Sequence, residues 1–185
     1  ATIFAAAPGV FRQMLRTDVP PLPRLRHGLS AGEALPQPLR LAWQAATGTN
    51  LHEAFGMTEV STFLSGSPDR PAPLGAAGYV QPGRRVAVLG SDNQPVPRGE
   101  AGELAVSTAD PGLMRGYIGQ PAPEGPWFRT GDAAVMAPDG AITPLGRKDD
   151  LLNAGGFRVS PAEVEAAFLA IPGLMAAAAT EVEVT

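Results

Sequence analysis

The chain has 185 residues, of which 44% are hydrophobic, and it carries a formal net charge of -4. Such a chain can bury a core in one domain or two small ones, and its negative charge excludes a general electrostatic affinity for nucleic acid. Because the chain has no cysteine, disulfide frameworks and thiolate metal sites are excluded as well.

The first 80 residues alternate between strand-like, turn and helix-like segments. We expect strands at residues 1–4 and 25–30 and helices at residues 8–15 and 36–47. The prolines at 20–23 prevent the first helix from continuing, and Gly48 ends the second, whose apolar face includes Leu39 and Trp43. This alternation is typical of an α/β layer with a parallel sheet.

The middle third is rich in Pro and Gly, and its helical periodicity fades. Short β-type segments are expected at residues 85–89, 103–107 and 133–137. The Pro-Asp-Gly sequence at 138–140 predicts a hairpin turn, because Pro presets φ and Gly accepts a positive φ. The pattern favours a small β-barrel or a sandwich-like unit.

The last third begins with the charged residues 147–150, which predict a connector. Ser160 and Glu163 have the spacing of a capping box around Pro161. A helix is therefore expected to begin there and to end at residues 171–173.

Within that helix, Val164, Ala167 and Phe168 predict a buried stripe. The strand-like residues at 1–4 and 181–184 make both ends look cut mid-structure. Interior strands need neighbours on both sides, so we expect missing segments of a longer parent or pairing in a homo-oligomer.

Three separated segments carry a specific pattern: residues 52–59, 128–132 and 146–161, with residues 30–36 upstream. Their order and spacing closely resemble the acyl-adenylate-forming superfamily of acyl-CoA synthetases, luciferases and peptide-synthetase adenylation enzymes. The match is most like the medium-chain and aryl acyl-CoA synthetases. These enzymes join a carboxylic acid to AMP, release pyrophosphate and pass the acyl group to a thiol.

The resemblance implies an α/β fold in three parts. Residues 1–80 would be the C-terminal part of a large α/β subdomain with a partial parallel layer. Residues 81–147 would form a small β-barrel subdomain, and residues 148–185 a hinge and the truncated start of a small α+β C-terminal domain.

The same resemblance implies a reacting centre at Thr58 and Glu59. Thr58 would hydrogen-bond a phosphate, and Glu59 would ligate magnesium, a hard cation that prefers oxygen ligands. The alternative is that both residues only cap and solvate the loop after Gly56.

A nucleoside site is implied by a second group of residues: Gly32, Glu33, Ala34, Phe55, Gly56, Asp132 and Arg147. The loop at 32–34 would line the adenine and Phe55 would stack on it, while Asp132 would accept hydrogen bonds from ribose hydroxyls and Arg147 would reach ribose or phosphate. Alternatively, Phe55 is core, Asp132 a turn residue and Arg147 part of a surface ion pair.

The resemblance also implies a swinging C-terminal domain with Asp149 as its hinge. Gly155 and Gly156 would admit the pantetheine arm of coenzyme A, and Arg158 would support their loop. The alternative is a simple turn at the two glycines and a solvated run at 149–150.

Two elements of the family are missing from the sequence. It contains no Ser/Thr/Gly-rich phosphate loop ending in Lys, and its only lysine is Lys148, at a variable motif position. We therefore expect a chain that is inactive or weak in isolation, from a parent that uses ATP, magnesium, coenzyme A and a small carboxylic acid.

Two other functions stay open. The chain could belong to a peptide-synthetase-type adenylation domain, whose acceptor thiol lies on a carrier protein, or it could be a non-catalytic nucleotide-binding or assembly module. His27 and His52 are too few and too isolated to indicate a metal cluster. No apolar run approaches the roughly 18 residues of a spanning helix, so a cytoplasmic protein without a membrane span is expected.

Overall fold

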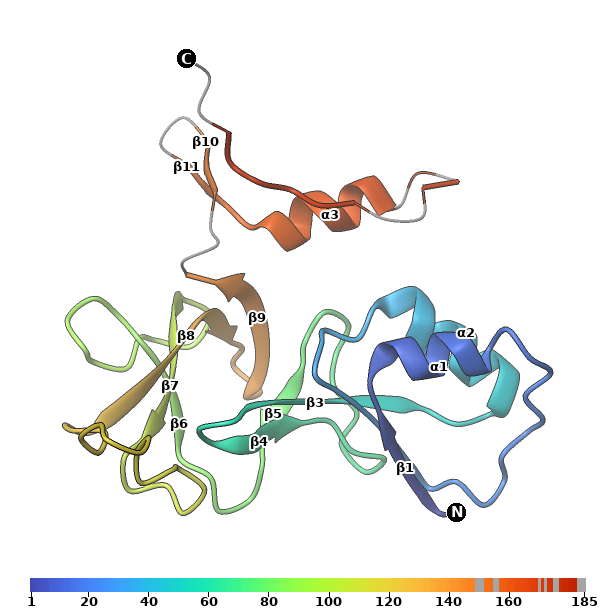
Figure 1. The fold of residues 1–185 in the computed structure, drawn as a ribbon, viewed down its shortest axis with the longest axis horizontal. Coiled ribbons are helices and arrows are strands. Elements are labelled where there is room, and N and C mark those ends of the chain that lie inside the picture. The colour runs from blue at the N-terminus through green and yellow to red at the C-terminus, as the bar shows by residue number, and fades with distance from the viewer. Residues whose placement is uncertain (149–151, 155–156, 170, 172, 175–176, 183–185) are drawn as a thin grey trace.

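A mixed nine-stranded sheet organises the chain in the computed structural model (Figure 1), which describes residues 1–148, 152–154, 157–169, 171, 173–174 and 177–182. Along the sheet the strands follow the order β1-β2-β3-β4-β5-β9-β8-β7-β6. They are β1 Ile3–Ala6, β2 His27–Ala31, β3 Leu51–Met57, β4 Ser61–Ser65, β5 Gly78–Val80, β6 Val86–Leu89, β7 Ala101–Ser107, β8 Trp127–Met136 and β9 Ala141–Arg147.

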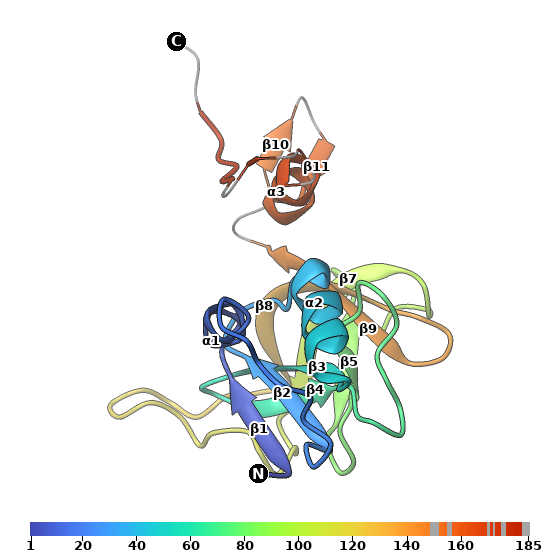
Figure 2. The same cartoon turned by 90° about the vertical axis from the view of Figure 1, so that its right-hand side faces the viewer.

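The parallel part of the sheet comprises β1, β2 and β3, with Ile3 opposite His27 and Gly28 opposite Leu51. Two helices, α1 (Pro8–Met14) and α2 (Gln37–Thr47), lie together over these strands (Figures 1 and 2). The predicted α/β layer is confirmed.

The helix α2 begins and ends as its sequence predicts. Pro36 precedes it in an extended conformation, and Gly48 follows it in the left-handed region with φ 73°. Its buried face carries Leu39 and Trp43. The Trp43 ring packs edge-to-face on Phe11 of α1, with ring centroids 4.9 Å apart. A hydrophobic cluster therefore joins the two helices to the parallel strands.

From β4 onward every pairing in the sheet is antiparallel. The predicted hairpin joins β8 to β9, with the Ala137 N–H donating to the Ala141 carbonyl at 2.8 Å and Gly140 at φ 90°. A second core fills this half of the molecule. Its largest fully buried members are Phe63, Leu64, Leu104, Ile142, Val60 and Val106.

Strands β3, β4 and β5 were not predicted from the sequence. The first three residues of β3, from Leu51 to Glu53, are buried in succession, so the strand lacks the alternation that identifies a half-exposed strand. Arg147 ends β9 rather than beginning the predicted connector, and Asp132 lies within β8 rather than in the turn that was its alternative. Strands β5 to β9 continue the same sheet, so the division into a separate β-barrel stays a prediction.

Beyond β9, the hairpin of β10 (Leu152–Ala154) and β11 (Phe157–Val159) leads into α3 (Pro161–Leu169), above the sheet in Figure 1. The predicted start of the helix is confirmed, but the prediction that the Ser160 side chain caps it is wrong. The buried Ser160 hydroxyl has no hydrogen-bond partner among the described residues, and it lies 3.6 Å from the position that a Cβ on Gly146 would occupy.

Two further expectations for this segment are wrong. Phe168 is 52% exposed and Ala167 is exposed, because no described part of the chain covers that side of α3. Glu181 and Val182 lie outside any strand, and residues 183–185 fall outside the described ones. In the described ranges, a bilayer-spanning helix is absent because none is both long and apolar enough.

Replacing Trp43 by Ala should lower the free energy of unfolding by about 3–5 kcal/mol, since the change empties a fully buried site between α1 and α2. Urea titration measures this. The matched control is Leu41→Ala in the same helix, where the side chain is 55% exposed and the change should stay within about 0.5 kcal/mol. Equal effects of the two substitutions would contradict the placement of α2.

Candidate functional site

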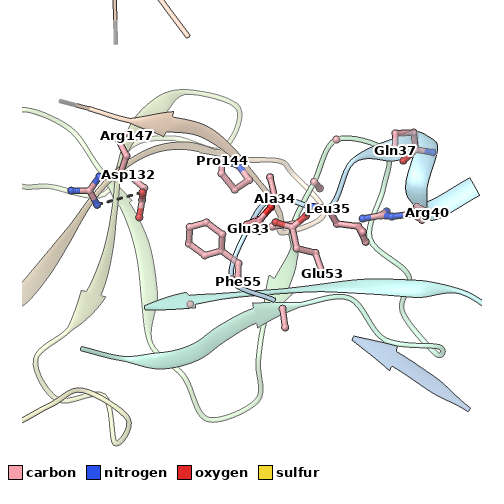
Figure 3. Close-up of a pocket in the computed structure, with 16 residues that line it drawn as sticks. Glu33, Ala34, Leu35, Gln37, Arg40, Glu53, Phe55, Asp132, Pro144 and Arg147 are labelled. Carbon is pink, nitrogen blue, oxygen red and sulfur yellow. Dashed lines mark hydrogen bonds and ion pairs between the residues drawn. The ribbon is translucent and has the colours of Figure 1, made fainter. Parts of the chain in front are cut away.

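A cavity of about 500 Å³ lies where the end of β3 meets the loops after β2 and before β5 (Figure 3). Asp132 and Arg147 stand at one end of it, Gln37 and Arg40 at the other, and Phe55 between them. The cavity collects a group of residues that the sequence had assigned to a nucleoside site: Gly32, Glu33, Ala34, Phe55, Gly56, Asp132 and Arg147.

The loop at 32–34 follows the carboxyl end of β2, within the parallel part of the sheet. Ligands of open α/β sheets bind at such carboxyl ends. Gly32 has φ 93°, in the left-handed region that favours glycine. Space is not the reason for glycine here, because a Cβ at this position would meet nothing within 4 Å. The Glu33 side chain is 62% exposed and its carboxylate lies 3.9 Å from the Arg12 guanidinium, so it lines the rim of the cavity.

Asp132 and Arg147 are register partners across β8 and β9. The Arg147 Nη1 lies 3.6 Å from the Asp132 Oδ1 and donates to the Thr130 carbonyl at 2.7 Å. Thr130 is itself held, because its hydroxyl donates to the Leu104 carbonyl at 3.0 Å and accepts from the Asp132 N–H at 3.2 Å. These bonds fix the carboxylate and the guanidinium as one pair at the cavity wall.

Burial raises the pKa of the Asp132 carboxyl above its ordinary value. The hydrogen bond to Thr130 and the charge of Arg147 oppose this rise without cancelling it, and the negative charge of Glu103 adds to it. Asp132 is therefore a partly desolvated acceptor, to which a ligand hydroxyl would bring a favourable hydrogen bond.

Behind this pair, Glu103 of β7 accepts hydrogen bonds from both Lys148 and Arg129, with Lys148 Nζ at 2.9 Å from Glu103 Oε2. Burial alone would raise the pKa of Glu103, but the two cations outweigh it and hold the pKa below its ordinary value. The only lysine of the chain is thus engaged away from the cavity.

Phe55 and Gly56 lie where the pairing of β3 with β4 changes register. Phe55 packs edge-to-face on Phe63, with centroids 5.7 Å apart, and is only partly buried, so part of it is left for the cavity. A Cβ on Gly56 would stand 2.3 Å from the Ser61 carbonyl oxygen, so only glycine lets β4 approach here.

Glu53 is a cavity residue to which the sequence analysis gave no role. It is 8% exposed, and its Oε2 accepts a hydrogen bond from the Leu35 N–H at 3.1 Å. Burial raises its pKa, while that hydrogen bond and the charge of Arg40 partly offset the rise. The sequence offers one local signal for it, a carboxylate among the apolar residues Leu51, Ala54 and Phe55, but the polar His52 beside it makes that signal weak.

Thr58 and Glu59 lie in the turn between β3 and β4 and do not line the cavity. Glu59 is half-buried; its carbonyl accepts from the Met114 N–H at 2.7 Å, and its carboxylate accepts from the Tyr117 hydroxyl. That hydrogen bond raises the pKa of Tyr117.

Among the described residues, no group of three or more His, Asp or Glu side chains could hold a metal ion. A metal site at Glu59 would therefore use fewer than three such side chains from the described part of the chain. This fits magnesium, which commonly uses one or two carboxylates together with substrate phosphates and water.

The structure describes only one of the residues assigned to the hinge and to coenzyme A, Arg158. Asp149, Gly155 and Gly156 lie outside the described residues. Arg158 lies in β11, opposite Asn153 of β10. Their predicted roles stay predictions.

His27 and His52 are not isolated from each other, contrary to the expectation from the sequence. Because β2 and β3 are neighbours, the two rings pack edge-to-face with centroids 5.2 Å apart. Burial lowers the pKa of His52 to about 4, with further contributions from His27 and Arg40.

Comparison with known sequences places residues 1–118 within the family model of AMP-binding enzymes. The mouse acyl-coenzyme A synthetase ACSM5, a mitochondrial protein, is 30% identical over 96% of this chain and 32% of its own length. The benzoate–CoA ligase of Thauera aromatica is 32% identical over 95% of this chain and 35% of its own length. The chain thus spans about a third of the length of these relatives.

Solved structures share the fold. The anthranilate CoA ligase AuaEII in complex with anthranoyl-AMP matches 97% of this chain and 36% of its own, with a TM-score of 0.81 and 31% identity. The O-succinylbenzoate coenzyme A synthetase of Bacillus subtilis, in complex with ATP and a magnesium ion, matches 99% of this chain and 39% of its own, with a TM-score of 0.84 and 25% identity.

The lowered pKa of His52 should make the fold acid-sensitive. As pH falls from 6.5 to about 4, the unfolded chain takes up a proton that the folded imidazole resists, so stability is lost across that window, by about 3 kcal/mol. Urea titrations of wild type and His52→Gln across the window should show a larger loss of stability in the wild type, by the contribution of His52. An NMR titration that gave His52 a pKa near 6.5 would contradict the expectation.

Proposed function

Because this chain belongs to the AMP-binding enzyme family, we propose that it supplies the nucleotide-binding part of an AMP-forming ligase that joins a carboxylic acid to coenzyme A. The observation that carries the proposal is the gathering of Asp132, Arg147, Phe55 and the loop at 32–34 around one cavity. These residues come from four separate stretches of the sequence.

In this proposal the cavity holds the nucleoside of ATP and later of AMP. The exposed part of Phe55 offers a flat apolar surface for the base, and Glu53 offers a carboxylate that can accept a hydrogen bond from an amino group. Asp132 accepts from the ribose hydroxyls, and Arg147 offers a fork of donors toward ribose or phosphate. Removing each of these groups would weaken nucleotide binding.

The turn at 58–60 carries the groups assigned to phosphate and magnesium. Thr58 is exposed and free to donate its hydroxyl, and Glu59 would ligate magnesium together with phosphate oxygens and water. When bound, the cation stabilises negative charge that develops on the phosphates. The position of Glu59 after the cavity-lining end of β3 supports this assignment.

The complete reaction would have two steps. The acid attacks the α-phosphorus of ATP to give acyl-AMP and pyrophosphate, and the thiol of coenzyme A then displaces AMP to give acyl-CoA. Asp149 would serve as the hinge between the steps, while Gly155, Gly156 and Arg158 would accompany the pantetheine arm. Segments outside this chain would supply the phosphate loop, the distal lysine and much of the acid pocket.

An aryl acid is the favoured substrate within this proposal. The names of the benzoate and anthranilate ligases among the similar proteins each specify an aryl acid, whereas ACSM5 is named only as an acyl-coenzyme A synthetase. We further propose that residues 1–80 belong to a large α/β subdomain, residues 81–147 to a β-barrel subdomain, and residues 148–185 to a hinge and the start of a C-terminal domain. The proposed location is cytoplasmic.

A non-catalytic nucleotide-binding module is the second candidate. The observation that favours it is the engagement of Lys148, the only lysine, with Glu103, which leaves the chain itself without a lysine for the transferred phosphate. Such a module would bind AMP or ATP in the same cavity without turnover.

Calorimetric titration with AMP tests the shared part of both candidates. Wild-type chain should bind AMP, and Asp132→Ala should weaken the affinity about tenfold or more, because charge-assisted hydrogen bonds to the ribose are lost. Asp18→Ala is the control, since Asp18 is exposed and does not line the cavity. Absent binding by the wild type, or equal affinities for the Asp132 variant, would refute the nucleotide site.

Pyrophosphate exchange separates a complete ligase from a binding module. With benzoate or octanoate and ATP, the isolated chain should give exchange near background, because it has neither the phosphate loop nor a second lysine. The full-length benzoate–CoA ligase of Thauera aromatica serves as the positive control. Robust exchange by the 185-residue chain would show that these elements are dispensable.

A further inference from the structure

A segment more than 50 residues later in the chain donates hydrogen bonds to the turn that carries Glu59. The Met114 N–H donates to the Glu59 carbonyl at 2.7 Å, and the Tyr117 hydroxyl donates to the Glu59 Oε1. Both the main chain and the side chain of Glu59 are therefore held from the same segment. Neither Met114 nor Tyr117 lines the nucleotide cavity.

A buried ion pair anchors that segment. Arg84 Nη1 lies 3.3 Å from Asp110 Oδ1, with the two side chains 13% and 0% exposed. The Asp110 carboxylate also accepts main-chain N–H groups from Arg85 at 2.6 Å and from Gly112 at 2.8 Å. Such a fully satisfied buried carboxylate fixes the segment rigidly.

The same arginine reaches the turn from its other side. Arg84 Nη2 donates to the carbonyl of Val60, the residue after Glu59. Two consecutive carbonyls of the turn are thus tied down, one by Arg84 and one by Met114. With the main chain fixed, the remaining freedom of Glu59 is the rotation of its side chain, and among the described residues Tyr117 alone donates a hydrogen bond to that carboxylate.

We propose that Tyr117 is a positioning residue for Glu59: its hydroxyl holds one carboxylate oxygen and leaves the other directed for a divalent cation. This inference rests on the proposed function, which makes Glu59 the magnesium ligand. A second partner that orients a ligating carboxylate commonly changes metal affinity by about tenfold or more when it is removed. Because Tyr117 is 48% exposed, its hydrogen bond should add little to fold stability.

The test compares ATP affinity with and without magnesium in the 185-residue chain. Calorimetry with ATP in saturating Mg²⁺ and in EDTA gives the magnesium-dependent gain in affinity. Tyr117→Phe should reduce this gain about tenfold, while the metal-free affinity for AMP and the thermal midpoint stay as in the wild type. Glu59→Gln should reduce the gain at least as much.

The other tyrosine provides the matched control. Tyr79 is also hydrogen-bonded to a carboxylate, with its hydroxyl 3.4 Å from Asp139 Oδ2, but Asp139 lies in the hairpin between β8 and β9 and not in the turn that carries Glu59. Tyr79→Phe should leave the magnesium-dependent gain unchanged. A loss of gain in both tyrosine variants would mean a general effect of removing a phenol, and would overturn the proposal.

The outcomes distinguish this inference from the proposed function. If Glu59→Gln loses the gain and Tyr117→Phe does not, the positioning role is wrong and the magnesium site stands. If the wild type binds AMP but shows no magnesium-dependent gain, the roles of Glu59 and Tyr117 both fail while the nucleotide site stands. If the wild type fails to bind AMP, the proposed function fails, and the positioning role falls with it.

Discussion

Strand β3 constrains the whole arrangement, because it pairs parallel with β2 on one side and antiparallel with β4 on the other. The parallel pairing brings the end of β3 beside the loop after β2, which opens the cavity. The antiparallel pairing returns the chain immediately and creates the turn at 58–60. Phe55 and Glu53 of β3 both line that cavity.

Charge is distributed unevenly around this space. Two partly desolvated carboxylates, Glu53 and Asp132, line the cavity, and burial raises the pKa of each. A third carboxylate, Glu103, is neutralised behind the wall by two cations. A ligand entering the cavity therefore meets a carboxylate and a guanidinium at one end, the Arg40 guanidinium at the other, and the Phe55 ring between them.

The sequence identified seven of the residues that line the cavity but missed β3, the strand that carries two of them, Phe55 and Gly56. Asp132 and Arg147 were paired by motif, and their strand register brings them together. Glu53 was missed because its local signal is weak, with the polar His52 beside it, and because its hydrogen-bond partner Leu35 lies 18 positions away. The contact of Tyr117 with Glu59 depends on how two distant loops fold, which no local pattern encodes. Phe168 is the opposite case: its apolar spacing in α3 predicted burial, but the side chain is exposed in the described structure.

Gly131 restricts which residues can occupy its position beside the Asp132–Arg147 pair. Its φ is 81°, and a Cβ there would stand 2.7 Å from the Arg147 Nη2. Any other residue would strain the chain and also push the guanidinium off Asp132. Gly131 has no side chain, yet it determines whether the Arg147 guanidinium can lie beside the Asp132 carboxylate. Replacing Gly131 would therefore change how this pair meets a ligand, although no contact of Gly131 itself would be lost.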